Sequence, residues 1–328
     1  METWRDRLRK NFTSRDAFAD FLHLTAEQKE QLLTSPHFSW NIPLRLAEKM
    51  QKGTLEDPLL RQFAALKEEL VEAAGFKEDP VQDACFQKTP SLLQKYATRA
   101  LLISTSACAM HCRFCFRQTY PYEGVAKEFA EEIACVRSDP TIDELILSGG
   151  DPLSLSERVL EGLFEDLKTI PHLKRVRFHT RFPIGIPERI DARFLSLLTN
   201  LPFQVWFLIH CNHPLELDND VIESMSRIRR LGIPVLSQTV LLKGVNDDEK
   251  VLEALFRSFV NVGITPYYLH QLDRVRGATH FEVPVVRGLE LIRHLEQSLP
   301  GYAVPKYVQE IPHRKSKTVL HSFQSVDP

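Results

Sequence analysis

Hydrophobic and polar positions divide the 328-residue chain into two parts with different patterns. Residues 1 to about 95 contain short amphipathic stretches with helix signals, such as the capping box Thr25-Ala-Glu-Gln28 and a helix start at Asp57-Pro58 that runs to Gly75. From residue 100, apolar runs rich in β-branched residues alternate with amphipathic stretches typical of helices. The strands predicted from these runs cover residues 100–105, 144–147, 175–179, 205–210, 234–239 and 265–269.

The spacing of these runs predicts an α/β fold. The last four begin about 30 residues apart, which is the length of one strand with its crossover helix. Six successive units without a reversal signal favour a partial (β/α)6 barrel at residues 96–300, after a helical region at 1–95 and before a C-terminal segment at 301–328. A doubly wound sheet is the alternative, because periodicity alone does not separate the two folds. In either case the carboxyl ends of the strands are where a site is expected.

Composition and charge narrow the class of protein. Hydrophobic residues make up 43% and charged residues 26%, and 41 Lys+Arg against 43 Asp+Glu give a formal charge of −2. This balance provides no field for nucleic acid or an anionic membrane. The apolar runs are far shorter than the roughly 20 residues that span a bilayer, and the first residues carry charges of both signs without an apolar stretch. The sequence therefore predicts a cytoplasmic protein with no nucleic-acid or membrane partner.

Three of the six cysteines lie within eight residues, in Cys108-Ala-Met-His-Cys112-Arg-Phe-Cys115, directly after the first predicted strand. Such a cluster in a large chain indicates metal binding or catalysis rather than disulfides. Three thiolates can hold three irons of a [4Fe–4S] cubane and leave the fourth iron open to a small molecule. Cys135 lies within a predicted helix and is expected to be a buried apolar side chain. The alternative is a structural zinc site with His111 as fourth ligand, although a residue adjacent to a ligand rarely reaches the same metal.

The C-x3-C-x-aromatic-C pattern, with Phe114 as the aromatic residue, resembles the signature of the radical S-adenosylmethionine (SAM) enzymes. The resemblance implies that the open iron binds SAM and that the reduced cluster cleaves it to a 5′-deoxyadenosyl radical. Ser148-Gly149-Gly150-Asp151, at the end of the second strand, is similar to the glycine-rich motif of that family. Gly149 and Gly150 allow close backbone approach to SAM, Asp151 is expected to contact its amino group, and Asn212 is expected to touch it as well.

Within that superfamily, residues 57 to 320 resemble the lysine 2,3-aminomutases. The order and spacing of several phrases carry this resemblance, namely Asp57-Pro-Leu-Leu-Arg-Gln62, Leu93-Gln-Lys-Tyr96-Ala-Thr-Arg99, Cys112-Arg-Phe-Cys-Phe-Arg117, His210-Cys-Asn212-His213-Pro, Gln238-Thr-Val-Leu-Leu-Lys-Gly-Val-Asn-Asp247 and Tyr267-Tyr-Leu-His-Gln-Leu-Asp273. Four histidines at predicted strand ends or loops are expected to be polar walls of the pocket: His210, His213, His270 and His280.

The resemblance also implies pyridoxal phosphate, held as a Schiff base by a lysine near the C-terminus. Lys317 fits the Lys-Thr-x-Leu pattern of the family, whereas the glycines that usually precede it are missing and Lys315 is the alternative. A lysine imine is suitable chemistry because it exchanges with the α-amine of a substrate. The groups that the resemblance implies for the cofactor phosphate are Lys95, Tyr96, Arg99 and Gln238.

Substrate recognition is predicted from charged residues that match the family. Arg117 matches an arginine that binds the substrate carboxylate, and a planar guanidinium suits that contact. Asp273 matches an aspartate that holds the ε-ammonium of lysine, and Glu310 lies where a second acid is found. Two carboxylates favour an ammonium over a neutral or acidic side chain, so L-lysine is the expected substrate.

Two departures from the larger enzymes refine the prediction. Those enzymes have a longer C-terminus with cysteines that bind zinc, whereas this sequence has no cysteine after Cys211, so zinc is not predicted. The resemblance is instead to the short members that form (R)-β-lysine for elongation factor P, with flavodoxin or ferredoxin as electron donor and a homo-oligomer as a possible assembly. The alternatives are β-lysine made for another purpose, a radical enzyme acting on another amino acid, and a non-catalytic iron–sulfur electron carrier.

Overall fold

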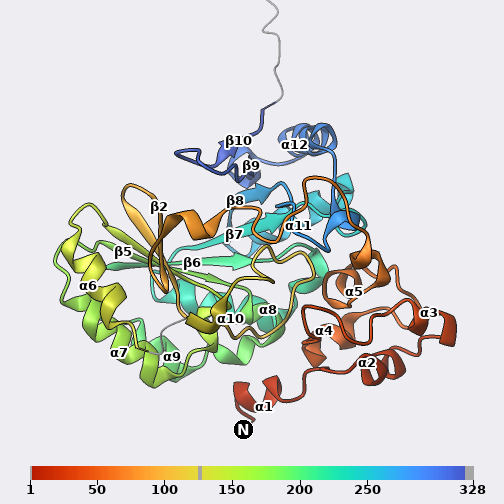
Figure 1. The fold of residues 1–328 in the computed structure, drawn as a ribbon, viewed down its shortest axis with the longest axis horizontal. Coiled ribbons are helices and arrows are strands. Elements are labelled where there is room, and N and C mark those ends of the chain that lie inside the picture. The colour runs from red at the N-terminus through yellow and green to blue at the C-terminus, as the bar shows by residue number, and fades with distance from the viewer. Residues whose placement is uncertain (1, 125–127, 322–328) are drawn as a thin grey trace, which may run out of the picture.

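A computed structural model of the chain describes residues 2–124 and 128–321. Five short helices, two 3-10 turns and a β-hairpin form the N-terminal region (Figure 1). The bounds of these elements are α1 (Trp4–Leu8), α2 (Arg15–Phe21), α3 (Ala26–Glu30), α4 (Leu44–Lys49), α5 (Pro58–Phe63), η1 (Lys67–Leu70), η2 (Asp83–Phe86), β1 (Gln87–Thr89) and β2 (Leu92–Tyr96).

Capping explains the helix starts in this region, and two predictions about it were wrong. Thr25 forms the expected capping box with Gln28, and the Asp57 carboxylate accepts hydrogen bonds from the first backbone amides of α5. That helix ends at Phe63 rather than at Gly75, because the backbone of residues 65–67 pairs with residues 31–33 instead of continuing the helix. Residues 87–96 are strands and not helix, since Leu92 and Leu93 are buried against the next strand.

One sheet of ten strands organises the rest of the molecule, and its strand order follows the sequence order from β1 to β10. The strands from β3 to β9 run parallel to one another, while β1, β2 and β10 are antiparallel at the two edges. The bounds are β3 (Arg99–Ile103), β4 (Glu144–Ser148), β5 (Arg175–Thr180), β6 (Gln204–His210), β7 (Val235–Val240), β8 (Thr265–His270), β9 (Lys306–Gln309) and β10 (Thr318–Val319).

The six predicted strands are therefore confirmed, each within a few residues of its expected position. The fold is α/β with a mixed, largely parallel sheet, and its sequential order differs from the reversal that a doubly wound sheet requires. The C-terminal segment adds β9 and β10 to the far edge, and its last residues, 322–328, lie outside the described residues. No helix in the described parts of the chain is long and apolar enough to cross a membrane.

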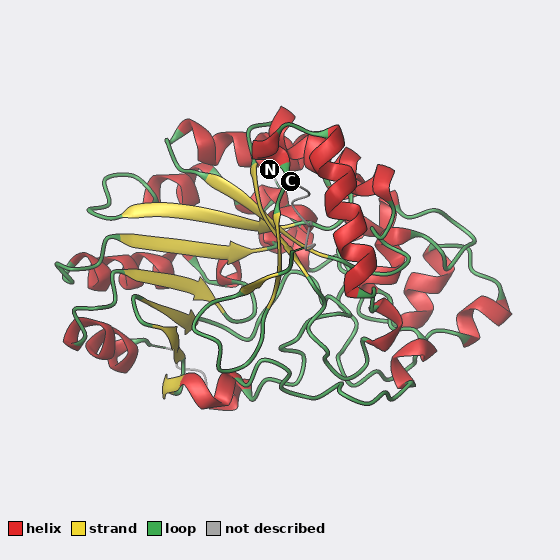
Figure 2. Cartoon of the chain, turned by 90° about the horizontal axis from the view of Figure 1, so that it is seen from above, coloured by secondary structure: helices red, strands yellow, loops and turns green. Residues whose placement is uncertain are grey.

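The helices that follow the strands cover the outer face of the curved sheet (Figure 2). Their bounds are α6 (Ala130–Ser138), α7 (Glu157–Lys168), α8 (Phe182–Gly185), α9 (Ala192–Leu197), α10 (Asn219–Arg230), α11 (Glu249–Asn261) and α12 (Val285–Ser298).

Strand alternation separates an apolar outer face from a polar inner face. On β5 and β6, Phe178 and Phe207 stack with ring centroids 4.8 Å apart, and Phe164 of α7 and Phe194 of α9 pack edge-on against Phe178. The neighbouring positions of the same strands point the other way, toward an inner cavity. The outer face therefore forms the core, which leaves the inner face free to carry polar groups.

Candidate active site

An inner cavity of about 340 Å³ lies on the concave side of the sheet and touches strands β2 to β8, the cysteine loop and the C-terminal segment. Its volume is in the range of ligand-binding pockets. Fourteen of the fifteen predicted site residues line it, namely Lys95, Tyr96, Arg99, Cys108, Cys112, Cys115, Arg117, Gly149, Gly150, Asp151, Gln238, Asp273, Glu310 and Lys317.

The three clustered cysteines face this cavity together. Burial raises the pKa of all three thiols, that of Cys115 to about 11, so only a bound cation makes three thiolates stable here. Among the described residues, no group of three or more His, Cys, Asp and Glu side chains is placed to hold a single metal ion. A cubane does not need that convergence, because each thiolate binds a different iron. The residues present therefore fit a [4Fe–4S] cluster.

Two further residues had predicted roles, His111 as a zinc ligand in the alternative site and Cys135 as a buried apolar side chain. The His111 ring nitrogen Nδ1 lies 2.8 Å from the Ser39 carbonyl oxygen, and its ring stacks on Phe38, so the ring is engaged without a thiol. That arrangement gives the zinc alternative no support. Cys135 packs from α6 against the core and is absent from the cavity lining, but it is only partly buried rather than buried as expected.

The N-terminal region holds the cysteine loop in place. The Asn41 side-chain nitrogen donates a hydrogen bond to the Cys108 carbonyl (3.1 Å). The backbone carbonyl of Asn41 accepts one from the His111 amide (3.0 Å). The Gln62 carbonyl accepts a hydrogen bond from the Arg113 amide at 2.9 Å. These contacts join residues far apart in sequence, so the N-terminal region supports the cysteine loop that lines the site.

Gly149 and Gly150 are required by a neighbouring backbone segment. A Cβ at Gly149, whose φ is +114°, would lie 2.7 Å from the Thr105 carbonyl oxygen, and one at Gly150 would lie 2.4 Å from that of Ala107. The Gly150 amide donates a hydrogen bond to Thr105 at 2.6 Å. Residues 104–107, which lead into the cysteines, thus lie directly against the end of β4. Both glycines also line the cavity, and their contact with SAM remains a prediction.

Asp151 ties the ends of two strands together. Its carboxylate accepts hydrogen bonds from the Thr180 hydroxyl (2.8 Å) and from the backbone amides of Leu153, Arg181 and Phe182. Burial nevertheless raises the pKa of this carboxyl to about 6. The carboxylate therefore has a clear structural role between β4 and β5, and its contact with the amino group of SAM stays a prediction.

Asn212 is the one predicted site residue that the structure places outside the cavity lining. It is fully buried, its amide nitrogen donates to Gln62 (3.0 Å), and its side-chain oxygen accepts from the Val240 amide (2.9 Å). Both polar atoms of the side chain are engaged within the protein, and the expected contact with SAM stays a prediction that the cavity lining does not support. The prediction rested on a polar residue at a strand end, and in this structure that residue connects Gln62 to the Val240 backbone.

The histidines give a mixed result. His210 and His270 line the cavity as predicted, whereas His213 and His280 do not. The His213 ring instead accepts a hydrogen bond from the Leu215 amide and caps a short turn.

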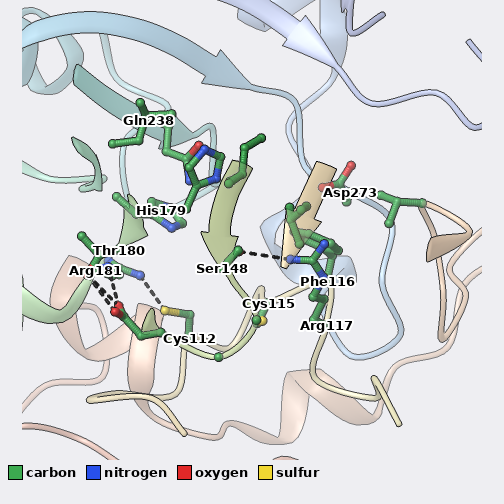
Figure 3. A pocket seen from close by; sticks show the side chains of 18 of the residues that line it. Cys112, Cys115, Phe116, Arg117, Ser148, His179, Thr180, Arg181, Gln238 and Asp273 are labelled. Atoms are coloured by element: carbon green, nitrogen blue, oxygen red, sulfur yellow. Dashed lines mark hydrogen bonds between the residues drawn. The ribbon is translucent and has the colours of Figure 1, made fainter. Parts of the chain in front are cut away.

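Arg117 extends into the cavity beside the cysteines (Figure 3). Its Nε donates to Asp83 at 2.7 Å and its Nη1 lies 3.4 Å from the Ser148 hydroxyl oxygen. Burial opposes the charge of this guanidinium, but Asp83 outweighs burial and raises the pKa of Arg117. Asp83 and Ser148 thus bind two of the three guanidinium nitrogens and fix the orientation of the Arg117 side chain.

Lys317 points into the same cavity, whereas Lys315 is exposed and is not among the lining residues. Lys317 Nζ lies 2.7 Å from the Glu310 carboxylate. The other carboxylate oxygen of Glu310 accepts from Lys95, and the Tyr96 hydroxyl is 3.2 Å away. Of the two candidate lysines, Lys317 is the one that lines this cavity, and its role as Schiff-base lysine stays a prediction. Lys95 is paired with Glu310.

Asp273 lines the cavity from the segment that follows β8 and is partly buried. Burial raises the pKa of its carboxyl to about 7, with Glu310 acting in the same direction and Lys317 in the opposite one. The two predicted ammonium-binding acids therefore share one environment with the lysine.

Several buried nitrogen atoms in the cavity lining lack a hydrogen-bond partner among the described residues. Arg177 Nε, His179 Nε2 and His210 Nε2 are buried and make no hydrogen bond to any described group. Burial lowers the pKa of both histidines, so these rings are neutral. Unpaired buried polar atoms are costly unless a ligand satisfies them. With Arg99, which stacks 4.2 Å from the Tyr96 ring, and Gln238, they fit an anionic, hydrogen-bonding cofactor such as pyridoxal phosphate.

Comparison with known proteins agrees with this geometry. Residues 102–255 match the model of the Radical SAM superfamily. The L-lysine 2,3-aminomutase of Escherichia coli (strain K12) is 38% identical over 324 residues, covering 97% of this chain and 94% of that protein. The chain belongs to the lysine 2,3-aminomutase family of radical SAM enzymes.

Other relatives of the family are similar over comparable parts of this chain. The Haemophilus influenzae L-lysine 2,3-aminomutase is 35% identical over 97% of this chain and 95% of its own length. The one from Bacillus subtilis is 31% identical over 97% of this chain and 69% of its own length. A radical SAM methyltransferase of Sphaerobacter thermophilus has a TM-score of 0.48 and 19% identity over 66% of this chain and 68% of its own, a likeness too low to carry an argument.

Sequence reasoning missed four residues of this site: Asp83, Arg177, His179 and Arg181. Arg177 and His179 alternate with Val176 and Phe178 on β5, so a polar inner face was visible in the period-2 pattern. Asp83 lay in a loop with no motif, and only its pairing with Arg117 reveals it.

Gly150→Ala is expected to displace the cysteine loop, because the new Cβ would overlap the Ala107 carbonyl oxygen. We expect a large loss of iron after anaerobic reconstitution, measured by iron analysis and visible absorbance. Gly162→Ala in α7 is the matched control, since its Cβ meets nothing within 4 Å, and it should add about 0.5–1 kcal/mol of stability. Full iron loading of Gly150→Ala would show that the close approach is not needed.

Lys317→Ala should abolish the visible absorbance of bound pyridoxal phosphate and leave iron content unchanged, because the cysteines do not contact this side chain. Lys315→Ala is the control, since Lys315 lies outside the cavity lining, and it should bind the cofactor as the unchanged chain does. The reverse pattern would transfer the role to Lys315.

Proposed function

We propose that this chain catalyses the conversion of L-lysine to β-lysine by radical migration of the 2-amino group to carbon 3. The observation that carries the proposal is a single cavity whose lining includes the three clustered thiols, Lys317, Arg117 and the carboxylates of Asp273 and Glu310. Family membership supplies the reaction class, and the charges in the cavity supply the substrate class.

The cavity contains suitable groups for each cofactor. Cys108, Cys112 and Cys115 would hold the [4Fe–4S] cluster, with SAM beside the Gly149-Gly150 segment, and Lys317 would hold pyridoxal phosphate. When bound, the cluster and SAM supply a 5′-deoxyadenosyl radical, and pyridoxal phosphate stabilises the unpaired electron during migration. Arg99, Gln238, Arg177 and His179 offer donors to the phosphate and ring of that cofactor, while Lys95 is engaged by Glu310.

The cavity carries both kinds of charge that a lysine molecule requires. Arg117 is buried next to the cysteine loop, with one nitrogen fixed by Asp83, and its remaining N–H groups can bind a carboxylate. Asp273 and Glu310 supply negative charge for an ε-ammonium group. A substrate with a neutral or acidic side chain would leave these acids without a cationic partner, which disfavours its binding.

The protein's main contribution is orientation and exclusion of water. The strands contribute apolar and neutral groups to the lining, such as Ile146, Leu208 and His210, among the charged ones, and the cysteine loop adds Ala109, Met110 and Phe114. Burial fixes the reacting groups and keeps solvent from a reactive radical.

The configuration and destination of the product belong to the same proposal. The short members that this sequence resembles form (R)-β-lysine for a lysine of elongation factor P, and we propose the same product and destination. Identity is higher to the Escherichia coli and Haemophilus influenzae relatives (38% and 35%) than to those of Clostridium subterminale and Methanococcus maripaludis (31% and 30%). We propose a flavodoxin or ferredoxin as electron donor and no zinc requirement.

The decisive experiment is anaerobic. The reconstituted protein with pyridoxal phosphate, SAM, dithionite and L-lysine should yield (R)-β-lysine, identified by chiral chromatography with mass detection. Elongation factor P from a strain lacking this gene should lose its β-lysyl modification, and added (R)-β-lysine should restore it.

Three other outcomes would separate the alternatives. Reductive cleavage of SAM without β-lysine would reject lysine as substrate and retain radical chemistry. β-Lysine formation with an unchanged elongation factor P would assign the product to another purpose. A cluster that transfers electrons but neither cleaves SAM nor binds pyridoxal phosphate would indicate an electron carrier.

The raised pKa of Asp273 predicts a pH effect on lysine binding. Below about pH 7 the carboxyl is protonated and cannot pair with an ammonium, so the KM for lysine should fall as pH rises from 6 to 8. In Asp273→Asn the KM should be high and nearly independent of pH over this range. A KM that falls with pH equally in both proteins would exclude Asp273 as the source.

A further inference from the structure

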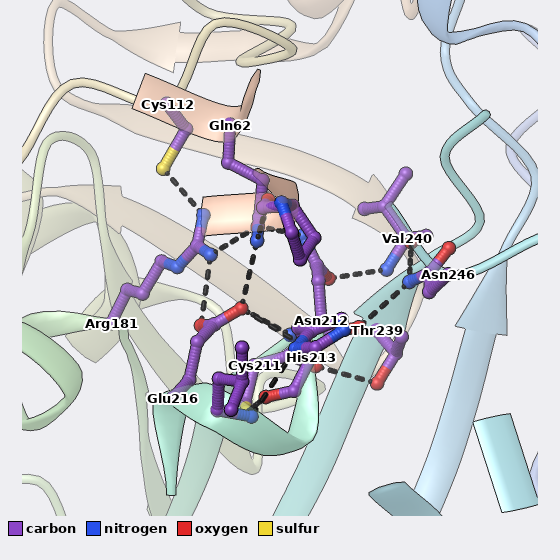
Figure 4. A network of polar contacts seen from close by, with 12 residues as sticks. Gln62, Cys112, Arg181, Cys211, Asn212, His213, Glu216, Thr239, Val240 and Asn246 are labelled. Atoms are coloured by element: carbon purple, nitrogen blue, oxygen red, sulfur yellow. Dashed lines mark hydrogen bonds and ion pairs between the residues drawn. The ribbon is translucent and has the colours of Figure 1, made fainter. Parts of the chain in front are cut away.

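Arg181 follows β5 directly, and its side chain points toward Cys112 of the cysteine loop (Figure 4). Its Nη1 lies 2.9 Å from Cys112 Sγ. Its Nη2 donates to the Gln62 side-chain oxygen at 2.6 Å and to the Glu216 carboxylate at 2.9 Å. One guanidinium therefore connects a predicted cluster ligand to a buried polar network outside the cavity lining.

The guanidinium is rigidly held and shielded from water. It is 6% exposed and lies 4.7 Å from the centroid of the Phe63 ring and 5.4 Å from that of Phe114. Its own backbone amide donates to Asp151 at 2.7 Å. Because water does not screen it, its charge acts strongly on its neighbours.

Glu216 is itself fixed, which determines the direction of Arg181. Its Oε1 accepts hydrogen bonds from the Gln62 side chain and from the backbone amides of Asn212 and His213, at 3.0–3.1 Å. Its Oε2 is thus left to Arg181 Nη2, and the other terminal nitrogen faces the sulfur. This arrangement also gives a structural role to Asn212 and His213, because their backbone amides hold the Glu216 carboxylate.

Arginine stays protonated in proteins, so the charge beside Cys112 is permanent. Reduction adds one electron to an iron–sulfur cluster and makes it more negative. A fixed positive charge and an N–H···S hydrogen bond stabilise the reduced form more than the oxidised form, which raises the reduction potential. The alternative is that Arg181 serves only to neutralise Glu216, in which case replacing it would leave the reduction potential of the cluster unchanged.

We propose that Arg181 is a positioning residue that raises the reduction potential of the iron–sulfur cluster through its contact with the Cys112 thiolate. The inference rests on the proposed binding of a cluster by the three cysteines. The electron comes from a low-potential one-electron donor and enters the cluster, and no bond of Arg181 is made or broken. Its effect is to make the cluster reducible by such a donor before SAM is cleaved.

The test compares Arg181→Lys and Arg181→Gln with the unchanged chain, in the absence of SAM, pyridoxal phosphate and lysine. Midpoint potentials are measured by anaerobic redox titration with electron paramagnetic resonance. We expect Arg181→Gln to lower the equilibrium constant for reduction at least tenfold, about 59 mV for one electron. Arg181→Lys, which keeps the charge, should give a smaller shift in the same direction.

Arg189→Lys is the matched control. Arg189 is also fully buried and pairs with a glutamate, Glu157, but it bonds to the carbonyls of Leu153 and Leu155 and not to a thiol. Its midpoint potential should equal that of the unchanged chain. Shifts in Arg181→Gln no larger than in this control, with iron content preserved, would overturn the inference.

A second measurement keeps the inference testable if the variants do not fold. The unchanged chain is labelled with ¹⁵N at the terminal nitrogens of arginine only, and pulsed electron paramagnetic resonance of the reduced cluster should show a ¹⁵N coupling. Absence of that coupling would overturn the contact. A chain that holds no cluster would instead refute the proposed function, and a cluster without β-lysine formation would leave this inference standing.

Discussion

The close approach of two backbone segments is the constraint on which the site depends. Residues 104–107 lie against Gly149 and Gly150 so tightly that neither position has room for a Cβ. This contact places the cysteine loop at the end of β4, beside strands whose inner faces carry polar groups. The sheet could tolerate other loops, but only this approach brings three thiols to the mouth of the cavity.

A second requirement is that so many buried charges be paired. Arg117 pairs with Asp83, Arg181 with Glu216, and Lys95 and Lys317 with Glu310. Unpaired ions at these depths would each cost several kcal/mol. Pairing allows the inner face of the sheet to be polar while the outer face, packed with Phe178 and Phe207, supplies the stabilising core.

Much of this arrangement could be predicted from the sequence, because its signals are local. Strand runs recur about every 30 residues, and the cysteine spacing and the Gly-Gly-Asp motif are contiguous. The hairpin at 87–96 was missed because a short apolar run does not distinguish strand from helix. Asp83 and Glu216 were missed because their roles come from partners 34 and 35 residues away in sequence. The buried position of Asn212 was not visible in the sequence, because a polar residue at a strand end serves packing as readily as binding.

The Glu310 carboxylate is shared between Lys95, from strand β2, and Lys317, from the C-terminal segment. It therefore connects these two parts of the chain inside the cavity. The Lys317 amine lies 2.7 Å from one oxygen of this acid, and the other oxygen accepts a hydrogen bond from Lys95. If Lys317 turns away from Glu310, that carboxylate oxygen loses its cationic partner while the other oxygen stays bound to Lys95. The acid can then accept a different cation without leaving its place.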